Sequence, residues 1–170
     1  MGGLVISGGR VVDPASGMDA VGDVALIDGK VAALGTGLGG AERVIDATGL
    51  VVAPGFIDLH AHGQSIPADR MQAFDGVTTT LDLEAGVMPV ASWYRRQAAE
   101  GRILNYGAAT NWAFARIGAM VGTNEESSLE AFGRAMRDRR WMDNIATEAE
   151  VKGILERLSQ GLDEGGIGIG

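Results

Sequence analysis

The chain contains no cysteine and only two histidines among its 170 residues. Without cysteine there is no disulfide, no thiolate metal ligand and no thiol nucleophile. Both histidines, His60 and His62, stand two positions apart in the segment PGFIDLHAH. The rest of the composition, with 46% hydrophobic residues, 21% charged residues and 27 glycines, is typical of a soluble globular protein rather than a disordered one.

Positive charge is also scarce. Fourteen Lys and Arg against 22 Asp and Glu give a net charge of −8. Proteins that bind nucleic acid need a basic face, so we expect no nucleic-acid partner. No apolar run approaches the roughly 20 residues of a membrane helix, so we expect no membrane partner. The N-terminal residues lack the pattern of a secretion signal, and the expected location is cytoplasmic.

Residues 1–53 are expected to form a small all-β segment. Short runs such as LVIS, DVALI and KVAALG alternate with turn residues, and no helical pattern interrupts them. Asp28-Gly29 lies between two of these runs and predicts a type I′ hairpin turn.

From residue 54 to residue 170 the pattern changes to alternating strands and helices. Strands are expected at 56–62, 77–86, 103–112 and 165–170, and helices at 67–76, 90–101, 126–140 and from Thr147 to about 165. Thr147 and Glu150 form a capping box for the last helix. Such alternation indicates parallel strands with helical crossovers, in an open sheet or a (β/α)₈ barrel.

The second segment has room for three β/α units and a fourth strand, whereas a complete (β/α)₈ barrel needs about 250 residues. The chain is therefore either a fragment of a larger protein or a compact open-sheet fold of its own. We favour the fragment, the N-terminal part of a barrel with about four strands. Open strand edges in such a piece favour self-association into a homo-oligomer.

Strand parity places both histidines on one face. In an extended 56–62 segment, alternate residues share a face, so His60 and His62 point the same way while Ile57, Leu59 and Ala61 point the other way, toward covering helices. Two imidazoles at this spacing can chelate one divalent metal. The alternative is a pair of ordinary histidines held by hydrogen bonds.

The second expected strand, VTTTLDLEAG, adds a carboxylate. One of its faces carries Thr78, Thr80, Asp82 and Glu84, and polar side chains on a buried strand need partners or a cation. Glu84 would lie level with the histidines and is the candidate third ligand, bridging two metals if two are bound. The alternative is a solvated carboxylate at the rim.

The stretch GTGLGG, with glycines at 35, 37 and 40, matches the pattern G-x-G-x-x-G. A dinucleotide site also needs a helix that begins there, and the following AERVIDATG is strand-like. We therefore expect a β-loop and assign no cofactor-binding residues.

VVAPGFIDLHAH, with a short-stranded segment before it and GVTTTLDLEAG after it, resembles the amidohydrolase superfamily. The likeness is greatest to the N-acyl-D-amino-acid deacylase (D-aminoacylase) branch, near dihydroorotases and hydantoinases. The P-G-[FL]-[IV]-D-x-H-x-H signature is specific, and LDEGGIGIG resembles that branch's approach to its fourth strand. The resemblance spans essentially the whole chain, but only the first third or so of such an enzyme. It implies half of a β-sandwich in residues 1–53 and part of a metal-bearing TIM barrel in residues 54–170.

The resemblance implies hydrolysis of a linear or cyclic amide C–N bond in a small-molecule substrate. It also implies one or two divalent metal ions, zinc first, with His60 and His62 as first-strand ligands. That branch usually has a cysteine ligand just after the second strand, where this chain has LEAG, so Glu84 is the substitute. Its Gly-His pair after the third strand is replaced by TNW. The general base, an aspartate late in the barrel, is expected beyond Gly170, so no catalytic residue is assigned and the chain alone is expected to be inactive.

A second class of function stays open from the sequence. A non-enzymatic, truncated barrel piece could bind metal, or bind only itself through its open strand edges.

Overall fold

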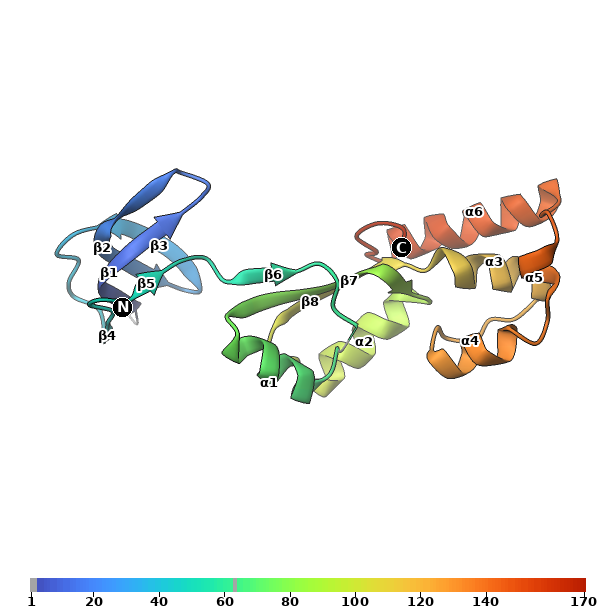
Figure 1. The fold of residues 1–170 in the computed structure, drawn as a ribbon, viewed down its shortest axis with the longest axis horizontal. Helices are drawn as coiled ribbons and strands as arrows, with labels where there is room; N and C mark the ends of the chain where they lie inside the picture. Colours follow the sequence, from blue (N-terminus) through green and yellow to red (C-terminus); the bar gives the residue numbers. More distant parts are fainter. Residues whose placement is uncertain (1–2, 63) are drawn as a thin grey trace. The chain divides into compact units, whose positions relative to one another are not determined.

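The computed structural model describes residues 3–62 and 64–170. The chain divides into two compact units, one ending at Pro54 and the other beginning at Gly55. The division falls one residue after the boundary expected from the sequence. Each unit has its own β-sheet (Figure 1). In the described part of the chain, no helix is both long and apolar enough to cross a bilayer.

The first unit is all β. Its strands are β1 (Gly3–Asp13), β2 (Met18–Ile27), β3 (Lys30–Gly35), β4 (Arg43–Asp46) and β5 (Val51–Val52). The sheet has the order β3-β2-β1-β4, and β5 pairs with β1. Asp28 and Gly29 join β2 to β3 with φ angles of 51° and 74°. Positive φ at both positions is the type I′ geometry that the sequence predicted.

A buried carboxylate anchors the loop that contains GTGLGG. Asp23 accepts hydrogen bonds from the Gly8 amide, the Ser7 hydroxyl and the Leu38 amide. These bonds, the Gly8 amide first, hold the pKa of Asp23 below its usual value. The loop leads directly into strand β4, which is the β-loop arrangement expected from the sequence.

The second unit is built on a parallel sheet with the order β6-β7-β8. Its strands are β6 (Phe56–Asp58), β7 (Val77–Val87) and β8 (Asn105–Thr110), and the crossovers are helices α1 (Ile66–Phe74) and α2 (Val90–Glu100). Both helices lie on the same face of the sheet (Figure 1). The expected strand at 165–170 lies parallel to the end of β8. The Thr110 amide donates to the Gly168 carbonyl, the Gly170 amide donates to the Thr110 carbonyl, and Ile169 forms a bridge with Thr110.

Four helices follow β8: α3 (Trp112–Val121), α4 (Leu129–Ala135), α5 (Arg140–Asp143) and α6 (Glu148–Asp163). Helix α6 begins at the predicted capping box, with Thr147 and Glu150 bonded reciprocally. Helix α3, which the sequence analysis did not anticipate, lies along α6 (Figure 1). A core cluster joins α3, α4 and α5 and contains Ile117, Met120, Ala135 and Trp141.

Strand β6 is shorter than the strand expected at 56–62, since it ends at Asp58. The Asp58 carboxylate accepts a hydrogen bond from the His60 amide two residues later, and this local bond takes the place of a ladder bond. The chain nevertheless stays beside β7, because the Ala61 amide donates to the Leu81 carbonyl. Of the three side chains expected to face covering helices, Ala61 is buried but Ile57 and Leu59 are exposed.

Candidate metal centre

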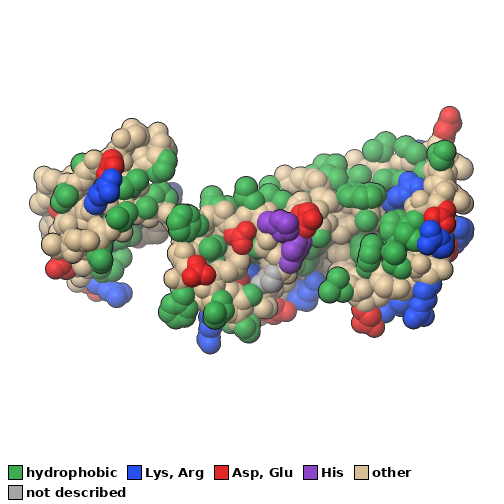
Figure 2. Space-filling model, in the orientation of Figure 1, with side chains coloured by type: hydrophobic (Ala, Val, Ile, Leu, Met, Phe, Trp, Pro, Cys, Tyr) green, Lys and Arg blue, Asp and Glu red, His purple; other side chains and the backbone are tan. Residues whose placement is uncertain are grey.

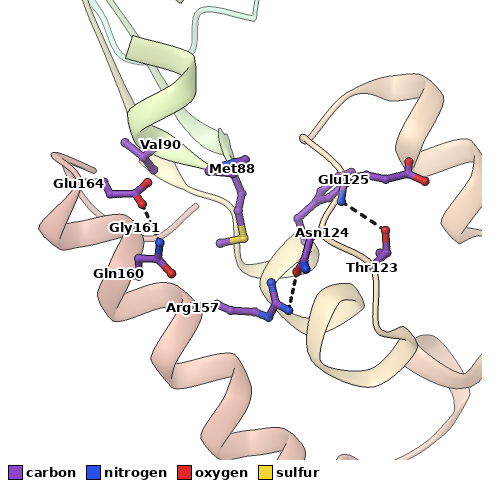
Figure 3. Close-up of a pocket in the computed structure, with 11 residues that line it drawn as sticks. Met88, Val90, Thr123, Asn124, Glu125, Arg157, Gln160, Gly161 and Glu164 are labelled. Atoms are coloured by element: carbon purple, nitrogen blue, oxygen red, sulfur yellow. Dashed lines mark hydrogen bonds between the residues drawn. The ribbon is translucent and has the colours of Figure 1, made fainter. Parts of the chain in front are cut away.

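One hollow of the second unit lies away from the histidines. It is lined by residues of α6 and of the segment after α3 (Figure 3). Its polar side chains bond to one another: Arg157 donates to Asn124 at 2.8 Å, and Gln160 donates to Glu164 at 2.8 Å. Glu164 also accepts from the Ala91 amide. These bonds join α6 to its neighbours, and this hollow is best explained as part of the packing.

Both histidines lie on the surface of the second unit beside acidic side chains (Figure 2). His60 and His62 follow β6, and Glu84 lies near the end of β7. The side chains of all three are half exposed or more. An ion from solvent can therefore reach them without any rearrangement of the core.

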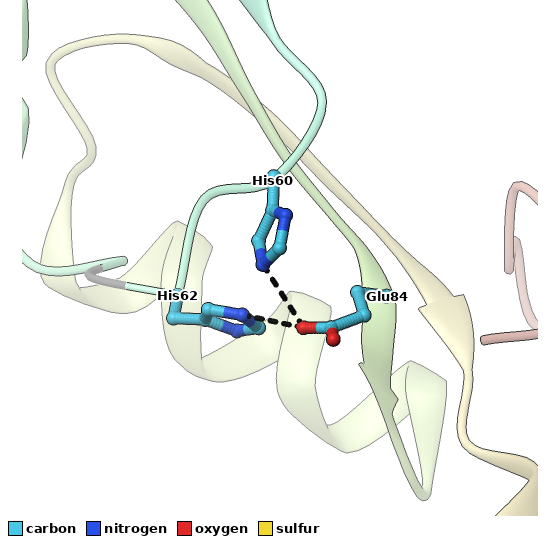
Figure 4. A group of neighbouring side chains, drawn as sticks. All are labelled: His60, His62 and Glu84. Carbon is cyan, nitrogen blue, oxygen red and sulfur yellow. Dashed lines mark hydrogen bonds and ion pairs between the residues drawn. The ribbon is translucent and has the colours of Figure 1, made fainter.

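The three side chains converge on one point (Figure 4). Glu84 Oε2 lies 3.0 Å from His60 Nε2 and 2.8 Å from His62 Nε2. One donor atom from each residue falls within a group whose members are all within 4.8 Å of one another. The imidazole rings meet edge to face, with centroids 4.7 Å apart. The two histidines point to one place, as expected from their spacing, although β6 ends at Asp58. The pairing of β6 with β7 brings Glu84 next to them.

The donor set fits a divalent metal such as zinc. Two donors of one tetrahedral zinc, each about 2.0–2.1 Å from the ion, lie roughly 3.3 Å apart. The observed separations of 2.8 and 3.0 Å differ from that by a few tenths of an ångström. A small outward turn of exposed side chains would make room for the ion. Two nitrogens and one carboxylate oxygen form a ligand type common for zinc.

Asp82 stands behind His62. Its Oδ2 lies 3.8 Å from His62 Nδ1, on the side of the ring opposite the nitrogen that faces Glu84. The other oxygen accepts a hydrogen bond from the Gly86 amide at 3.0 Å. At 3.8 Å the contact is longer than a hydrogen bond. Asp82 therefore places a negative charge beside His62 without fixing the orientation of its ring.

Asp58 holds the backbone that carries His60. Its Oδ1 accepts from the His60 amide at 3.0 Å, and its Oδ2 accepts from Gln72 Nε2 at 2.9 Å. Gln72 belongs to α1, so Asp58 connects that helix to the histidine segment.

A buried ion pair contacts Gln64, which follows the two histidines in the sequence. Arg102 and Asp69 have no exposed side-chain surface and pair in a bidentate fashion. Burial alone would raise the pKa of Asp69, but the hydrogen bonds and charge of Arg102 outweigh it and lower that pKa. Arg102 also donates to Gln64 at 3.2 Å, and Gln64 donates to the Gly107 carbonyl of β8.

The structure thus brings together all three residues that the sequence singled out. Sequence reasoning did not assign the supporting contacts of Gln64, Gln72 and the Asp69–Arg102 pair. One signal was present in the sequence. Asp58 stands two residues before His60, and an aspartate side chain commonly accepts a hydrogen bond from the backbone amide two residues later. The long-range contacts leave no such local trace.

Comparison with known proteins shows which family and which relatives the chain resembles. A model of the Amidohydrolase family matches residues 43–169. The dihydroorotase of Streptococcus thermophilus (strain CNRZ 1066) is 31% identical over 180 residues, which cover 96% of this chain and 36% of that protein.

Two solved structures resemble the chain over most of its length. The N-acyl-D-glutamate deacylase from Bordetella bronchiseptica, crystallised with zinc and a phosphonate inhibitor, matches with a TM-score of 0.77 and 25% identity. A D-aminoacylase shares the fold, with a TM-score of 0.73 and 24% identity. Each match covers 98% of this chain and 37% of the other. The chain therefore spans little more than a third of the length of these relatives.

Proposed function

This chain belongs to the amidohydrolase family, and from that premise we propose that it forms the N-terminal part of a metal-dependent hydrolase of an amide C–N bond. The observation that carries the proposal is the convergence of His60, His62 and Glu84 on one point. We propose these three as metal ligands, with zinc as the first choice and one or two ions bound. Cysteine cannot contribute, because the chain has none.

The substrate class that we propose is a linear N-acyl-D-amino acid, with a cyclic amide as the alternative. The linear class is supported by the Bordetella deacylase, whose structure matches nearly the whole chain. The cyclic class is supported by the sequence likeness to a dihydroorotase, again over nearly the whole chain.

A bound divalent metal lowers the pKa of its water and polarises the scissile carbonyl. The residues of this chain would hold and orient that centre. His60 and His62 would present their Nε2 atoms, with the negative charge of Asp82 beside His62 and the backbone of His60 fixed by Asp58. Glu84 would add the negative charge that partly neutralises the ion. The general base is proposed to lie in sequence beyond Gly170.

Metal content tests the proposal. The purified chain, dialysed against zinc and then against metal-free buffer, should retain about one equivalent or more of zinc per chain. The His60→Ala, His62→Ala variant should retain almost none, because it loses both nitrogen donors. Glu84→Gln should weaken retention, and Glu130→Gln, at an exposed glutamate on α4, serves as the matched control. Equal, negligible zinc in the parent chain and the double variant would reject the metal centre.

A second candidate function is non-enzymatic self-association. The large apolar side chains of Phe56, Ile57 and Leu59 are exposed along and just after β6. Exposed apolar side chains at a strand edge invite pairing with another chain. A concentration-dependent mass in sedimentation, unaffected by the double histidine substitution, would favour this function over the metal centre.

A further inference from the structure

A pocket of about 550 Å³ opens beside the candidate metal ligands. His62, Asp82 and Glu84 line one end of it. Its other walls come from the end of β7, helix α2, the start of α3 and the segment that begins α4. A molecule with one polar end at the histidines would thus have its remainder in contact with α3 and α4.

The polar side chains in these walls are engaged in structural bonds. Asn111 Oδ1 accepts from the Phe114 amide and caps α3, and Ser128 Oγ accepts from the Ala131 amide and caps α4. Ser127 Oγ accepts from the Met88 amide. Apart from the hydroxyl protons of the two serines, these walls therefore offer a ligand mainly their apolar surface.

Two large apolar side chains supply that surface. Trp112, the first residue of α3, is 52% exposed, and Leu129, the first residue of α4, is 93% exposed. Phe132, one turn further along α4, is partly buried and also lines the pocket. Covering such surface with an apolar ligand group removes it from water, which is favourable.

Arg96 is the cation in these walls, and its charge is already balanced. Its Nη1 donates to Glu126 Oε2 at 2.7 Å, and Ser92 donates to the other oxygen at 2.8 Å. The Ser92 hydrogen bond first, and the charge of Arg96 after it, lower the pKa of Glu126. Glu126 therefore stays ionised at neutral pH. A second carboxylate on a ligand would meet a neutralised arginine.

Resting on the proposed function, we propose that this pocket is the subsite for an apolar substituent of the amide substrate, branched aliphatic or aromatic, and that it discriminates against an acidic one. Leu129 and Trp112 are the residues that determine this specificity.

The test uses two probes of matched shape, 4-methylpentanoate and succinate, in which an isopropyl group replaces a carboxylate. Each probe has a carboxylate for the metal, and binding to the zinc-loaded chain is followed by tryptophan fluorescence. Trp93 and Trp112 both line the pocket, whereas Trp141 lies outside it, and the half-exposed Trp112 should give the larger response. We expect 4-methylpentanoate to bind about tenfold more tightly or better. In Trp112→Phe the fluorescence response should shrink to that of Trp93, while calorimetry still detects binding.

Leu129→Asp should abolish the preference by placing a charge on the apolar wall. The substitution is compatible with folding, because Leu129 is exposed and an acidic residue is favourable in the first turn of a helix. Ile145→Asp, at an equally exposed apolar residue outside the pocket, is the matched control and should keep the preference.

The outcomes separate the two proposals. A chain that binds zinc but binds succinate as tightly as 4-methylpentanoate overturns the apolar subsite and leaves the metal centre standing. The same holds if the preference survives Leu129→Asp. A chain that binds no zinc overturns the proposed function, and the subsite with it.

Discussion

At the scale of single residues, the candidate metal centre depends on one backbone contact as well as on its three proposed ligands. His60 lies after the end of β6, in an isolated bridge with Asp82 of β7, and its own amide donates to the Asp58 carboxylate rather than to β7. The Asp58 carboxylate is itself held by Gln72 of α1. Without the bond from the His60 amide to Asp58 the imidazole would sample more positions, and ordering it would cost part of the binding free energy of the metal.

Asp58→Ala should therefore weaken zinc binding by roughly tenfold, as measured by calorimetric titration, because an orienting contact outside the ligand set is lost. Asp58→Asn keeps an oxygen acceptor for the His60 amide and should restore most of the affinity. Asp75→Ala, at the exposed end of α1, is the control. Unchanged zinc affinity in Asp58→Ala would show that Asp58 serves only the fold.

The sequence singled out the residues that the structure brings together at the candidate site, but not their surroundings. The H-x-H spacing and the alternation of side chains along VTTTLDLEAG pointed to His60, His62 and Glu84, because both patterns are local. The contact of Asp82 with His62, and of Arg102 with Gln64, joins residues 20 or more positions apart. Such contacts depend on how α1 and α2 pack, which no short pattern encodes.

At the scale of elements, the helices show where sequence patterns fail. The capping box predicted the start of α6 at Thr147, because its hydrogen bonds are local. Helix α3 was missed because WAFARIGAMV is apolar on most sides, and a short apolar run fits a strand or a helix equally well. Asn111, which caps α3, carried the overlooked signal.

The buried pair that joins α1 to the start of β8 gives a prediction for stability. Arg102→Met leaves Asp69 without its partner, and breaking a buried pair in this way costs about 3–5 kcal/mol. Denaturant unfolding should show this loss. The double variant Asp69→Leu, Arg102→Met should recover much of it, since no unpaired charge remains buried. A single variant as stable as the parent would mean that water reaches Asp69.

The pH dependence of the unfolding free energy gives a second test of the Asp69–Arg102 pair. The pKa of Asp69 is lower in the folded chain than its unfolded value of about 3.9. The unfolded state then binds the proton more readily, so the stabilisation is present above that value and is lost as the pH falls through the folded pKa. The parent chain should lose stability below about pH 4 more steeply than the double variant does.

At the scale of the whole molecule, the expected fold class is confirmed. The chain is α/β, and its match to the Bordetella deacylase covers 98% of its length, as an N-terminal portion of an amidohydrolase barrel would. The all-β character of the first unit followed from its turns and short runs. The expected strand near Gly170 pairs in parallel with the end of β8, but its short length could not be predicted, because its backbone hydrogen bonds are long-range contacts.

The span of the match leads to a prediction about activity. The chain corresponds to 37% of the length of the deacylase, and the general base is proposed to lie beyond Gly170. The 170-residue chain should therefore show no appreciable hydrolysis of N-acetyl-D-leucine, as measured by release of the free amino acid, even when it is loaded with zinc. Turnover well above that of the His60→Ala, His62→Ala variant would contradict this expectation.

The edge-to-face contact of the two histidine rings, 4.7 Å apart, has a spectroscopic consequence. Every imidazole proton in the molecule belongs to this pair, because the chain has no other histidine. Each ring lies in the ring-current field of the other, so the two sets of resonances should be separated. Once the amide protons are exchanged for deuterium, the imidazole Hε1 resonances of a one-dimensional proton spectrum therefore report on this site without isotope labelling.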